Sequence, residues 1–290
     1  MSLGANNVKR TYCLSFDCPD KVGIVSRISD VFSANGGWIE EASHHSDEES
    51  LRFFSRIVVR AETLPFGIDV LRSKLTPLAQ EFEMNWRLVD SQQKKRVVLM
   101  CSKGSHCMTD LLDRWKSGDI SCDIVGVIAN HEDLRGLVEW YGIPFHCVPV
   151  EKNDKAAGFA LTETLIDELR ADCIVLARYM QILPHNLCEK YRHKVINIHH
   201  SFLPSFIGAK PYHQASRRGV KLIGATCHYV TEELDEGPII DQDVVRVSHQ
   251  QSVEDLVRLG KDVEKTVLAR GLRNHLEDRV LVYGNKTIVF

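Results

Sequence analysis

The sequence lacks several features that would assign it to a specialised class of protein. It has no run of about 18 apolar residues, so no membrane-spanning helix is expected. Its basic residues form only short runs, and the net charge of −3 argues against nucleic acid as a partner. The first ten residues are polar and have no apolar centre, which predicts no secretion signal and a cytoplasmic location.

The nine cysteines lack the spacing of a disulfide framework or a metal site. No two of them form a Cys-x-x-Cys pair, and the separation of Cys101 from Cys107 fits no common zinc spacing. A reducing compartment agrees with this irregular distribution. We therefore expect no metal site, and nothing else in the sequence requires a cofactor.

With 290 residues, of which 44% are hydrophobic and 26% charged, the chain has room for two cores. The first of two expected domains, residues 1–91, shows an apolar spacing typical of a helix at Val22, Val25, Ile28 and Phe32. The pattern of the whole segment predicts a β-α-β-β-α-β order, which is a small ferredoxin-like unit. A polar stretch without apolar residues, 91–95, follows as the linker.

In the second expected domain, residues 92–290, apolar strands alternate with helices. This α/β alternation predicts a Rossmann-like, mainly parallel sheet covered by helices, followed by a long amphipathic helix and a closing hairpin. The expected strands are 96–101, 123–129, 146–150, 173–177 and one that begins at Val195. The long helix is expected over 254–276 and the hairpin over 279–290.

The most informative segment is the strand that begins at Val195. Alternation along a strand places the side chains of Asn197 and His199 on the same face, just before Pro204 ends any strand. Open α/β sheets bind their ligands at the carboxyl ends of strands. An amide and an imidazole there suit a carbonyl oxygen that becomes an oxyanion. Asp235, in a loop bounded by Gly237 and Pro238, could add a carboxylate for acyl transfer or acyl hydrolysis.

Three blocks in this half resemble the folate-dependent formyltransferase family. They are Asn197-Ile198-His199, the run 201–208 and the run 234–240, and the resemblance covers roughly residues 96–274. The family includes glycinamide ribonucleotide transformylases, methionyl-tRNA formyltransferases and 10-formyltetrahydrofolate hydrolases. The first domain is similar to an ACT domain, a regulatory module, through Asp17-x-Pro19-Asp20-x-x-Gly23 and Asn35-Gly36.

An ACT domain in front of a formyltransferase-type domain resembles the arrangement of the hydrolases. The resemblance therefore implies hydrolysis of 10-formyltetrahydrofolate to formate and tetrahydrofolate, which would supply formate for purine biosynthesis and balance one-carbon pools. It also implies that Asn197, His199 and Asp235 are catalytic. The substrate-binding residues that it implies are Met180, Gln181, Ile182, Leu183, Tyr229, Val230, His200, Gly104 and Ser105.

Two alternatives stay open on the sequence: formyl transfer to glycinamide ribonucleotide, and a non-catalytic folate or amino-acid sensor. The loop 102–106 keeps Gly104 and Ser105 but departs from the Gly-x-Gly-Ser-Asn-like phosphate loop of the transferases, which favours water as acceptor. Tyr212 and His213 could crowd the acceptor side. The ACT resemblance further implies an amino-acid effector, with glycine and methionine the first candidates, and a homo-oligomer.

Overall fold

The computed structural model describes residues 9–151, 153–205 and 211–290. The chain divides into two compact units. One comprises residues 1–94, 278–281 and 288–290, and the other comprises residues 95–277 and 282–287. Among the described residues, no helix is both long enough and apolar enough to cross a membrane.

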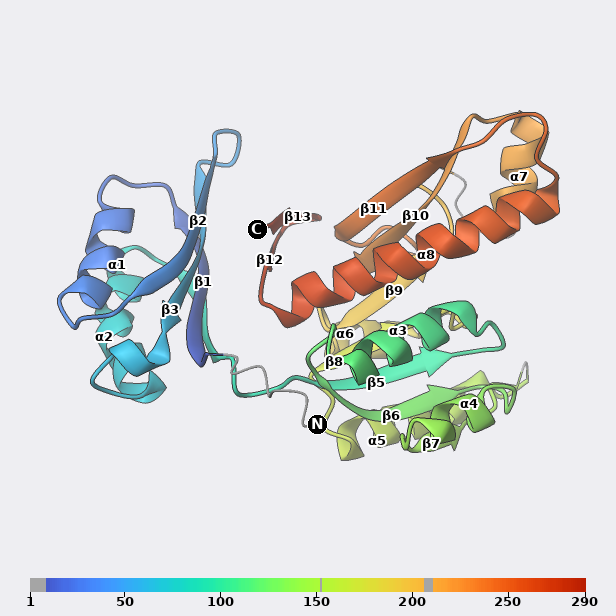
Figure 1. The fold of residues 1–290 in the computed structure, drawn as a ribbon, viewed down its shortest axis with the longest axis horizontal. Coiled ribbons are helices and arrows are strands. Elements are labelled where there is room, and N and C mark those ends of the chain that lie inside the picture. Colours follow the sequence, from blue (N-terminus) through green and yellow to red (C-terminus); the bar gives the residue numbers. More distant parts are fainter. Residues whose placement is uncertain (1–8, 152, 206–210) are drawn as a thin grey trace, which may run out of the picture. The chain divides into compact units, whose positions relative to one another are not determined.

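The N-terminal unit has the predicted β-α-β-β-α-β order. Its four strands form an antiparallel sheet in the order β2-β3-β1-β4, the arrangement of a ferredoxin-like unit (Figure 1). Its elements are β1 Thr11–Pro19, α1 Ile24–Ser33, β2 Ile39–Asp47, β3 Arg52–Arg60, a 3-10 turn Ala61–Thr63, α2 Ile68–Glu81 and β4 Asn85–Asp90.

The core of this unit lies between its two helices and the sheet. Helix α1 contributes Ile24, Ile28 and Phe32, each buried, at a spacing of one helical turn. The sequence pattern predicted Ile28 and Phe32 correctly, but Val22 is fully exposed because the helix begins after it, and Val25 is 40% exposed. The apolar face of α1 is thus set by Ile24, not by the two valines.

The C-terminal unit is built on a seven-stranded sheet in the order β11-β10-β9-β8-β5-β6-β7. Strands β5 to β9 are parallel, as predicted, whereas β10 and β11 pair antiparallel at one edge. The elements are β5 Arg96–Cys101, α3 His106–Ser117, β6 Asp123–Ala129, α4 Arg135–Trp140, β7 Phe145–Cys147, α5 Lys155–Glu168, β8 Cys173–Leu176, α6 His185–Lys190, β9 Val195–His199, α7 Pro211–Arg218, β10 Leu222–Tyr229, β11 Ile239–Arg246 and α8 Val253–Leu276. The closing hairpin is β12 Val280–Tyr283 and β13 Lys286–Val289.

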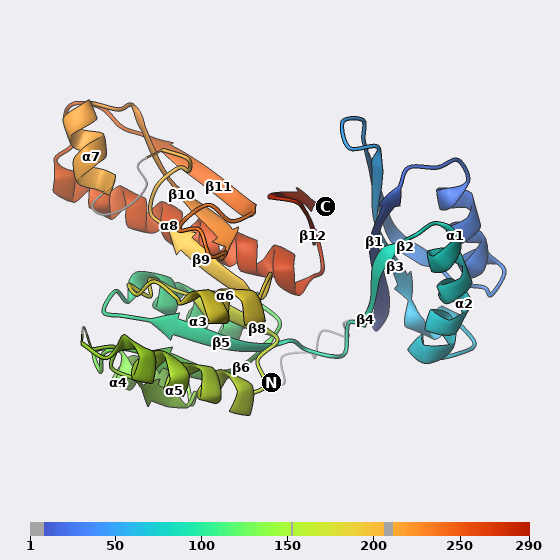
Figure 2. The same cartoon turned by 180° about the vertical axis from the view of Figure 1, so that it is seen from behind.

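Helices cover both faces of this sheet. In Figure 1, α3 and α8 lie in front of it and contact each other. Figure 2 shows the opposite side, where α5 and α6 pack on the sheet through one apolar cluster that includes Phe159 and Leu187. Covering on both faces explains why Val97 to Cys101 of the central strand β5 are completely buried.

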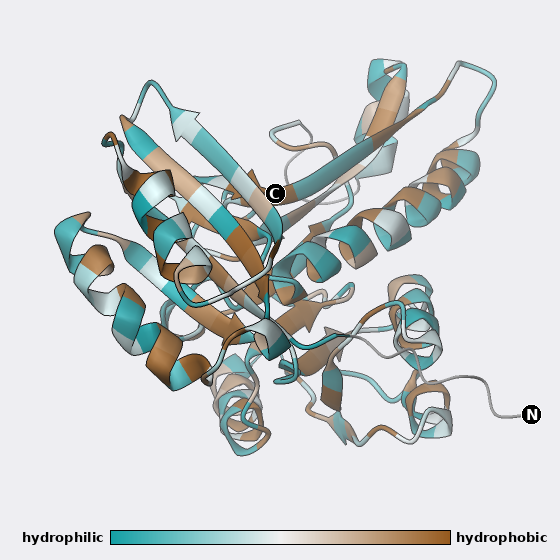
Figure 3. Cartoon of the chain, turned by 60° about the vertical axis from the view of Figure 1, so that its left-hand side comes forward, coloured by the Kyte–Doolittle hydropathy of each residue, from teal (hydrophilic) through white to brown (hydrophobic). Residues whose placement is uncertain are grey.

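Helix α8 begins at a capping box, in which Ser252 and Asp255 satisfy each other's backbone amides. Hydrophilic and hydrophobic colours alternate around the helix in Figure 3, as expected of an amphipathic helix. It packs against β9, β10 and β11. At Gly271 an added Cβ would collide with Cys227 of β10, so glycine permits this close approach of helix and sheet.

Candidate active site

A cavity of about 580 Å³ opens where β8 and β9 end and where the chain leaves β10. Small-molecule sites commonly have volumes of roughly 300–1,000 Å³, so it could hold an organic substrate. Asn197 and His199 line it together, which confirms that they share one face of β9. Asp235, from the loop between β10 and β11, lines the same cavity. The structure thus brings together the three residues that the sequence singled out.

Asp235 forms an ion pair with His199. Its Oδ2 lies 3.2 Å from Nδ1 of His199, and the two side chains are only 8% and 5% exposed. The Asp235 backbone has a φ of 59°, in the left-handed region that asparagine and aspartate tolerate better than most residues. Two residues on, an added Cβ on Gly237 would collide with the carbonyl of Tyr229, so glycine lets the loop lie against β10. Local backbone features therefore hold the carboxylate in place.

The ion pair fixes where His199 carries a proton. A carboxylate can only accept, so Nδ1–H of His199 donates to Asp235. Burial alone would raise the pKa of Asp235, but the hydrogen bond and the charge of His199 hold it below its ordinary value. The other ring nitrogen, Nε2, is buried and has no hydrogen-bond partner among the described residues. That nitrogen is positioned to interact with a ligand.

His228, on β10, orients Asn197. Its Nδ1 lies 2.9 Å from the carbonyl oxygen of Tyr229 and must donate to it, and burial lowers the pKa of His228, so the ring is neutral. Its Nε2 then accepts from the amide of Asn197, 3.1 Å away. The amide has a second N–H, which is left for a ligand. His228 thus supports the site through its hydrogen bond with Asn197.

The loop after β8 and the residue after β10 form an apolar part of the cavity. Met180, Gln181, Ile182, Leu183 and Val230, which the family resemblance implies bind substrate, all line it. The loop is tied to the neighbouring strand ends: Ser102 Oγ accepts from Met180 N at 2.9 Å and donates to Asn130 at 2.6 Å. Ser102 belongs to the loop 102–106, which corresponds to the phosphate loop of the transferases. Here its side chain supports the wall of the cavity.

Three residues expected to bind substrate do not line this cavity. Tyr229 follows His228 on β10 and faces the other way, where its buried hydroxyl bonds with His275 Nδ1 at 2.8 Å. Gly104 and Ser105 also lie outside the cavity wall, and the residue that follows them, His106, lines it instead. Strand alternation and the start of helix α3 account for these corrections.

His200, which the family resemblance implies binds substrate, lines the cavity beside His199. Its ring centroid lies 5.3 Å from that of His199 and 5.9 Å from that of Tyr212. Burial, and then the positive charge of Arg178, lower the pKa of His200 to about 4. At neutral pH the ring is therefore uncharged and offers one donor and one acceptor.

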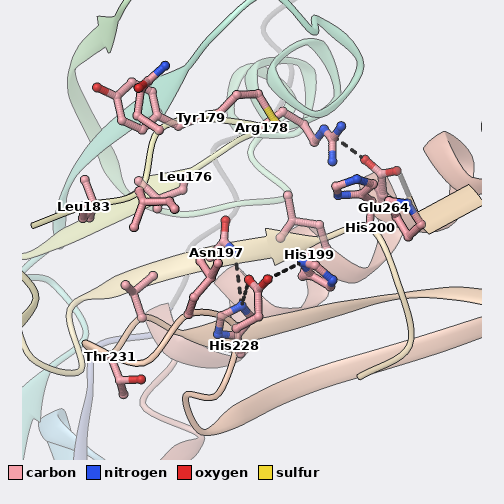
Figure 4. Close-up of a pocket in the computed structure, with 18 of the residues that line it drawn as sticks. Leu176, Arg178, Tyr179, Leu183, Asn197, His199, His200, His228, Thr231 and Glu264 are labelled. Carbon is pink, nitrogen blue, oxygen red and sulfur yellow. Dashed lines mark hydrogen bonds and ion pairs between the residues drawn. The ribbon is translucent and has the colours of Figure 1, made fainter. Parts of the chain in front are cut away.

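A second group of polar residues lines the cavity and includes Arg178, at the start of the loop after β8, and Glu264 of α8, which no sequence pattern indicated. Figure 4 shows Leu176 and Leu183 on one side of Asn197 and His199, and Arg178, His200 and Glu264 on the other. Donor atoms of Glu264, His106 and Cys107 lie within 4.8 Å of one another, a spacing that a metal ion could use. However, Glu264 already accepts hydrogen bonds from His106 and from Tyr212 and lies 3.5 Å from Arg178, so an internal ion-pair cluster fits these residues better.

Comparisons with known proteins agree with this site. The sequence profile of the formyl transferase family matches residues 95–272. A formyltetrahydrofolate deformylase of Corynebacterium sp. (strain P-1) is 47% identical over 278 residues, which are 96% of this chain and 97% of that protein. The crystal structure of a formyltetrahydrofolate deformylase from Pseudomonas syringae pv. tomato is 63% identical, with a TM-score of 0.96, and the match covers 98% of this chain and 96% of that one.

A transferase structure matches about two thirds of the chain. Glycinamide ribonucleotide transformylase 1 from Symbiobacterium toebii is 29% identical, with a TM-score of 0.64, over 68% of this chain and 94% of its own. The chain belongs to the formyl transferase family. Within that family, its similarity over nearly the whole length is to proteins named formyltetrahydrofolate deformylase.

Proposed function

We propose that this protein hydrolyses 10-formyltetrahydrofolate to formate and tetrahydrofolate. The observation that carries the proposal is the arrangement of Asn197, His199 and Asp235 beside an apolar wall, with Nε2 of His199 lacking a partner among the described residues. The apolar wall suits a pterin ring, and the relatives named formyltetrahydrofolate deformylase support this choice of substrate. The proposed reaction requires no metal or cofactor.

In the proposed mechanism, water attacks the formyl carbon while two donors stabilise the negative charge that develops on its oxygen. One donor is the second N–H of Asn197, and the other is Nε2–H of His199 in its charged form. Loss of one donor of this kind typically raises a barrier by about 2.7–4 kcal/mol. The Asp235 carboxylate accepts from Nδ1–H of His199, which leaves Nε2 for the substrate.

Collapse of the tetrahedral intermediate completes the reaction. Asp235 orients the attacking water, receives the proton that this water loses and relays it to N10. The bond between the formyl carbon and N10 then breaks, which releases tetrahydrofolate and formic acid, and the acid ionises to formate. The lowered pKa of Asp235 keeps it ionised at neutral pH, as an acceptor of this proton must be.

The function is tested by supplying the protein with 10-formyltetrahydrofolate, with and without glycinamide ribonucleotide. We expect formate and tetrahydrofolate in equal amounts and no formylated ribonucleotide, even when the amine is abundant. Tetrahydrofolate release is followed by absorbance, and formate and the formylated amine by mass spectrometry. Formylated ribonucleotide as the main product would identify a transferase instead, and no turnover at all would favour a sensor.

We further propose that the N-terminal unit binds an amino-acid effector, glycine or methionine, and that the protein is a homo-oligomer. The βαββαβ fold of that unit, which ACT domains share, supports this proposal. An effector must bind two states with different affinity, so formate release by the full chain should change when glycine or methionine is added. Unchanged rates across saturating concentrations of both would contradict it. The cytoplasmic location stays a prediction.

A further inference from the structure

A second polar cluster, apart from Asn197, His199 and Asp235, lines the same cavity. Its centre is Glu264 of α8, whose side chain is only 1% exposed. Oε1 accepts a hydrogen bond from the Tyr212 hydroxyl at 2.6 Å, and Oε2 accepts one from His106 Nε2 at 2.8 Å. Arg178 Nε lies 3.5 Å from Oε2. We call these four residues the Glu264 cluster.

The charge at the centre of this cluster is satisfied from within the protein. Burial alone would raise the pKa of Glu264, but the bond from His106, the charge of Arg178 and the bond from Tyr212 together lower it. Glu264 is therefore ionised, and each of its oxygens already accepts from a protein donor. Removing those donors to admit a second substrate would leave a buried charge without partners, which is strongly unfavourable.

The absence of a side chain at Gly260 of α8 makes room for the Tyr212 hydroxyl in this cluster. Gly260 precedes Glu264 by about one turn of α8, and the hydroxyl end of Tyr212 occupies the place where a Cβ of residue 260 would lie. Any side chain there would push Tyr212 away from the carboxylate. Arg178 has a φ of 64°, a left-handed conformation that is uncommon for a residue other than glycine.

The cluster lies across the reactive centre from the apolar wall. In Figure 4, Leu176 and Leu183 are on one side of His199, and Arg178 and Glu264 are on the other. His200 lies between His199 and Tyr212, with ring centroids 5.3 Å and 5.9 Å away. A pterin ring against the apolar wall would thus place the formyl group between that wall and the cluster.

Tyr212 also lines a second cavity. Among the described residues, His200, Pro211 and Tyr212 line both the substrate cavity and a neighbouring cavity of about 480 Å³, whose other walls include Phe202 and Ile223. Tyr212 is only 7% exposed and is the largest of the three shared side chains. Removing its ring would therefore enlarge the space next to the reactive centre.

We propose that the Glu264 cluster selects the acceptor of the formyl group. It fills the side from which an amine would approach the formyl carbon, and it leaves space for water alone. The inference rests on the proposed hydrolysis. With an amine acceptor, the amine nitrogen would form the new bond to the formyl carbon, the bond to N10 would break, and the proton lost by the amine would pass to N10.

The test measures how formyl groups divide between water and an added amine. Parent, Tyr212→Ala, Tyr212→Phe and Glu264→Gln are each given 10-formyltetrahydrofolate and a large excess of glycinamide, and formate and formylglycinamide are quantified. We expect little formylglycinamide from the parent and a fraction at least about tenfold higher from Tyr212→Ala. Tyr212→Phe and Glu264→Gln should show smaller increases, since they loosen the cluster but keep its bulk.

Tyr141→Ala, half-buried at the end of α4 and outside both cavities, is the matched control and should divide formyl groups as the parent does. Thermal unfolding identifies the variants that are folded, and the two conservative variants carry the test if Tyr212→Ala is not. Equal fractions in the parent and all folded variants would overturn the inference, as would high transfer by the parent. A parent that releases no formate would instead contradict the proposed function, so the two failures are distinguishable.

Discussion

His199→Ala is expected to lower the turnover of 10-formyltetrahydrofolate by about 100-fold or more, with folate binding largely retained. The variant loses the Nε2–H donor to the developing oxyanion, and a single donor of this kind is typically worth about 100-fold to 1,000-fold in rate. The apolar wall that would hold the pterin comes from the loop after β8 and from Val230, so it remains intact. Single-turnover rates and folate titration on the folded variant measure the two effects separately.

A matched control distinguishes this loss from general damage. His249, in the loop between β11 and α8, is exposed and does not line the cavity, so His249→Ala should behave as the parent does. If His199→Ala turned over within about twofold of the parent, the proposed role of the ring would be wrong. A parallel loss of folate binding would instead indicate that the cavity had collapsed.

Asp235→Asn is expected to produce a loss of similar size, about 100-fold, while it preserves the shape of the loop. Its amide oxygen can still accept from Nδ1–H of His199, but the negative charge beside the ring and the acceptor of the water proton are both lost. The comparison with Asp235→Ala, which also removes the hydrogen bond, separates charge from geometry. Asp113→Asn, an exposed carboxylate of α3 outside the cavity, is the control.

The lowered pKa of Asp235 also gives this prediction a pH dependence. A carboxyl group whose pKa is lower in the folded protein stabilises it above the unfolded value of about 3.9, and that stability is lost as the pH falls through the folded value. The stability difference between parent and Asp235→Asn should therefore be constant from neutral pH down to about pH 5 and shrink below about pH 4. Denaturant unfolding across this range measures it, and a difference that already disappears near pH 6 would contradict the charged state assigned to Asp235.

Much of the site follows from local sequence. Alternation along β9 was enough to place Asn197 and His199 on one face, because successive side chains of a strand point in opposite directions. The same periodicity predicted the βαββαβ unit and the parallel strands β5 to β9. The same periodicity gave a wrong core face for the start of α1. Val22 fits the helical spacing, but the helix begins at Ile24, so Ile24 is buried and Val22 is exposed.

The edge of the larger sheet was harder to predict. Strand β10 runs antiparallel to both of its neighbours, β9 and β11, and both edge strands carry mixed polar and apolar residues, so the predicted pattern of parallel strands and helices did not extend to them. Two results follow from their placement. His228 faces the cavity and holds Asn197, whereas Tyr229, its neighbour, faces away. Composition alone could not show which of the two residues faces the cavity, because the register of a strand depends on its pairing with neighbouring strands.

Sequence patterns were sufficient for the fold class, the order of elements and the pair of side chains on β9, and they offered Asp235 as a third member. The tertiary contacts pair Asp235 with His199 and add the buried carboxylate of Glu264, which accepts from Tyr212 and which no sequence pattern indicated. Glu264 lies in the middle of a long amphipathic helix, where nothing local distinguishes it from a surface carboxylate. Its burial depends on Gly260 admitting Tyr212 from another helix, and such contacts between segments far apart in the chain leave no periodic signal in the sequence.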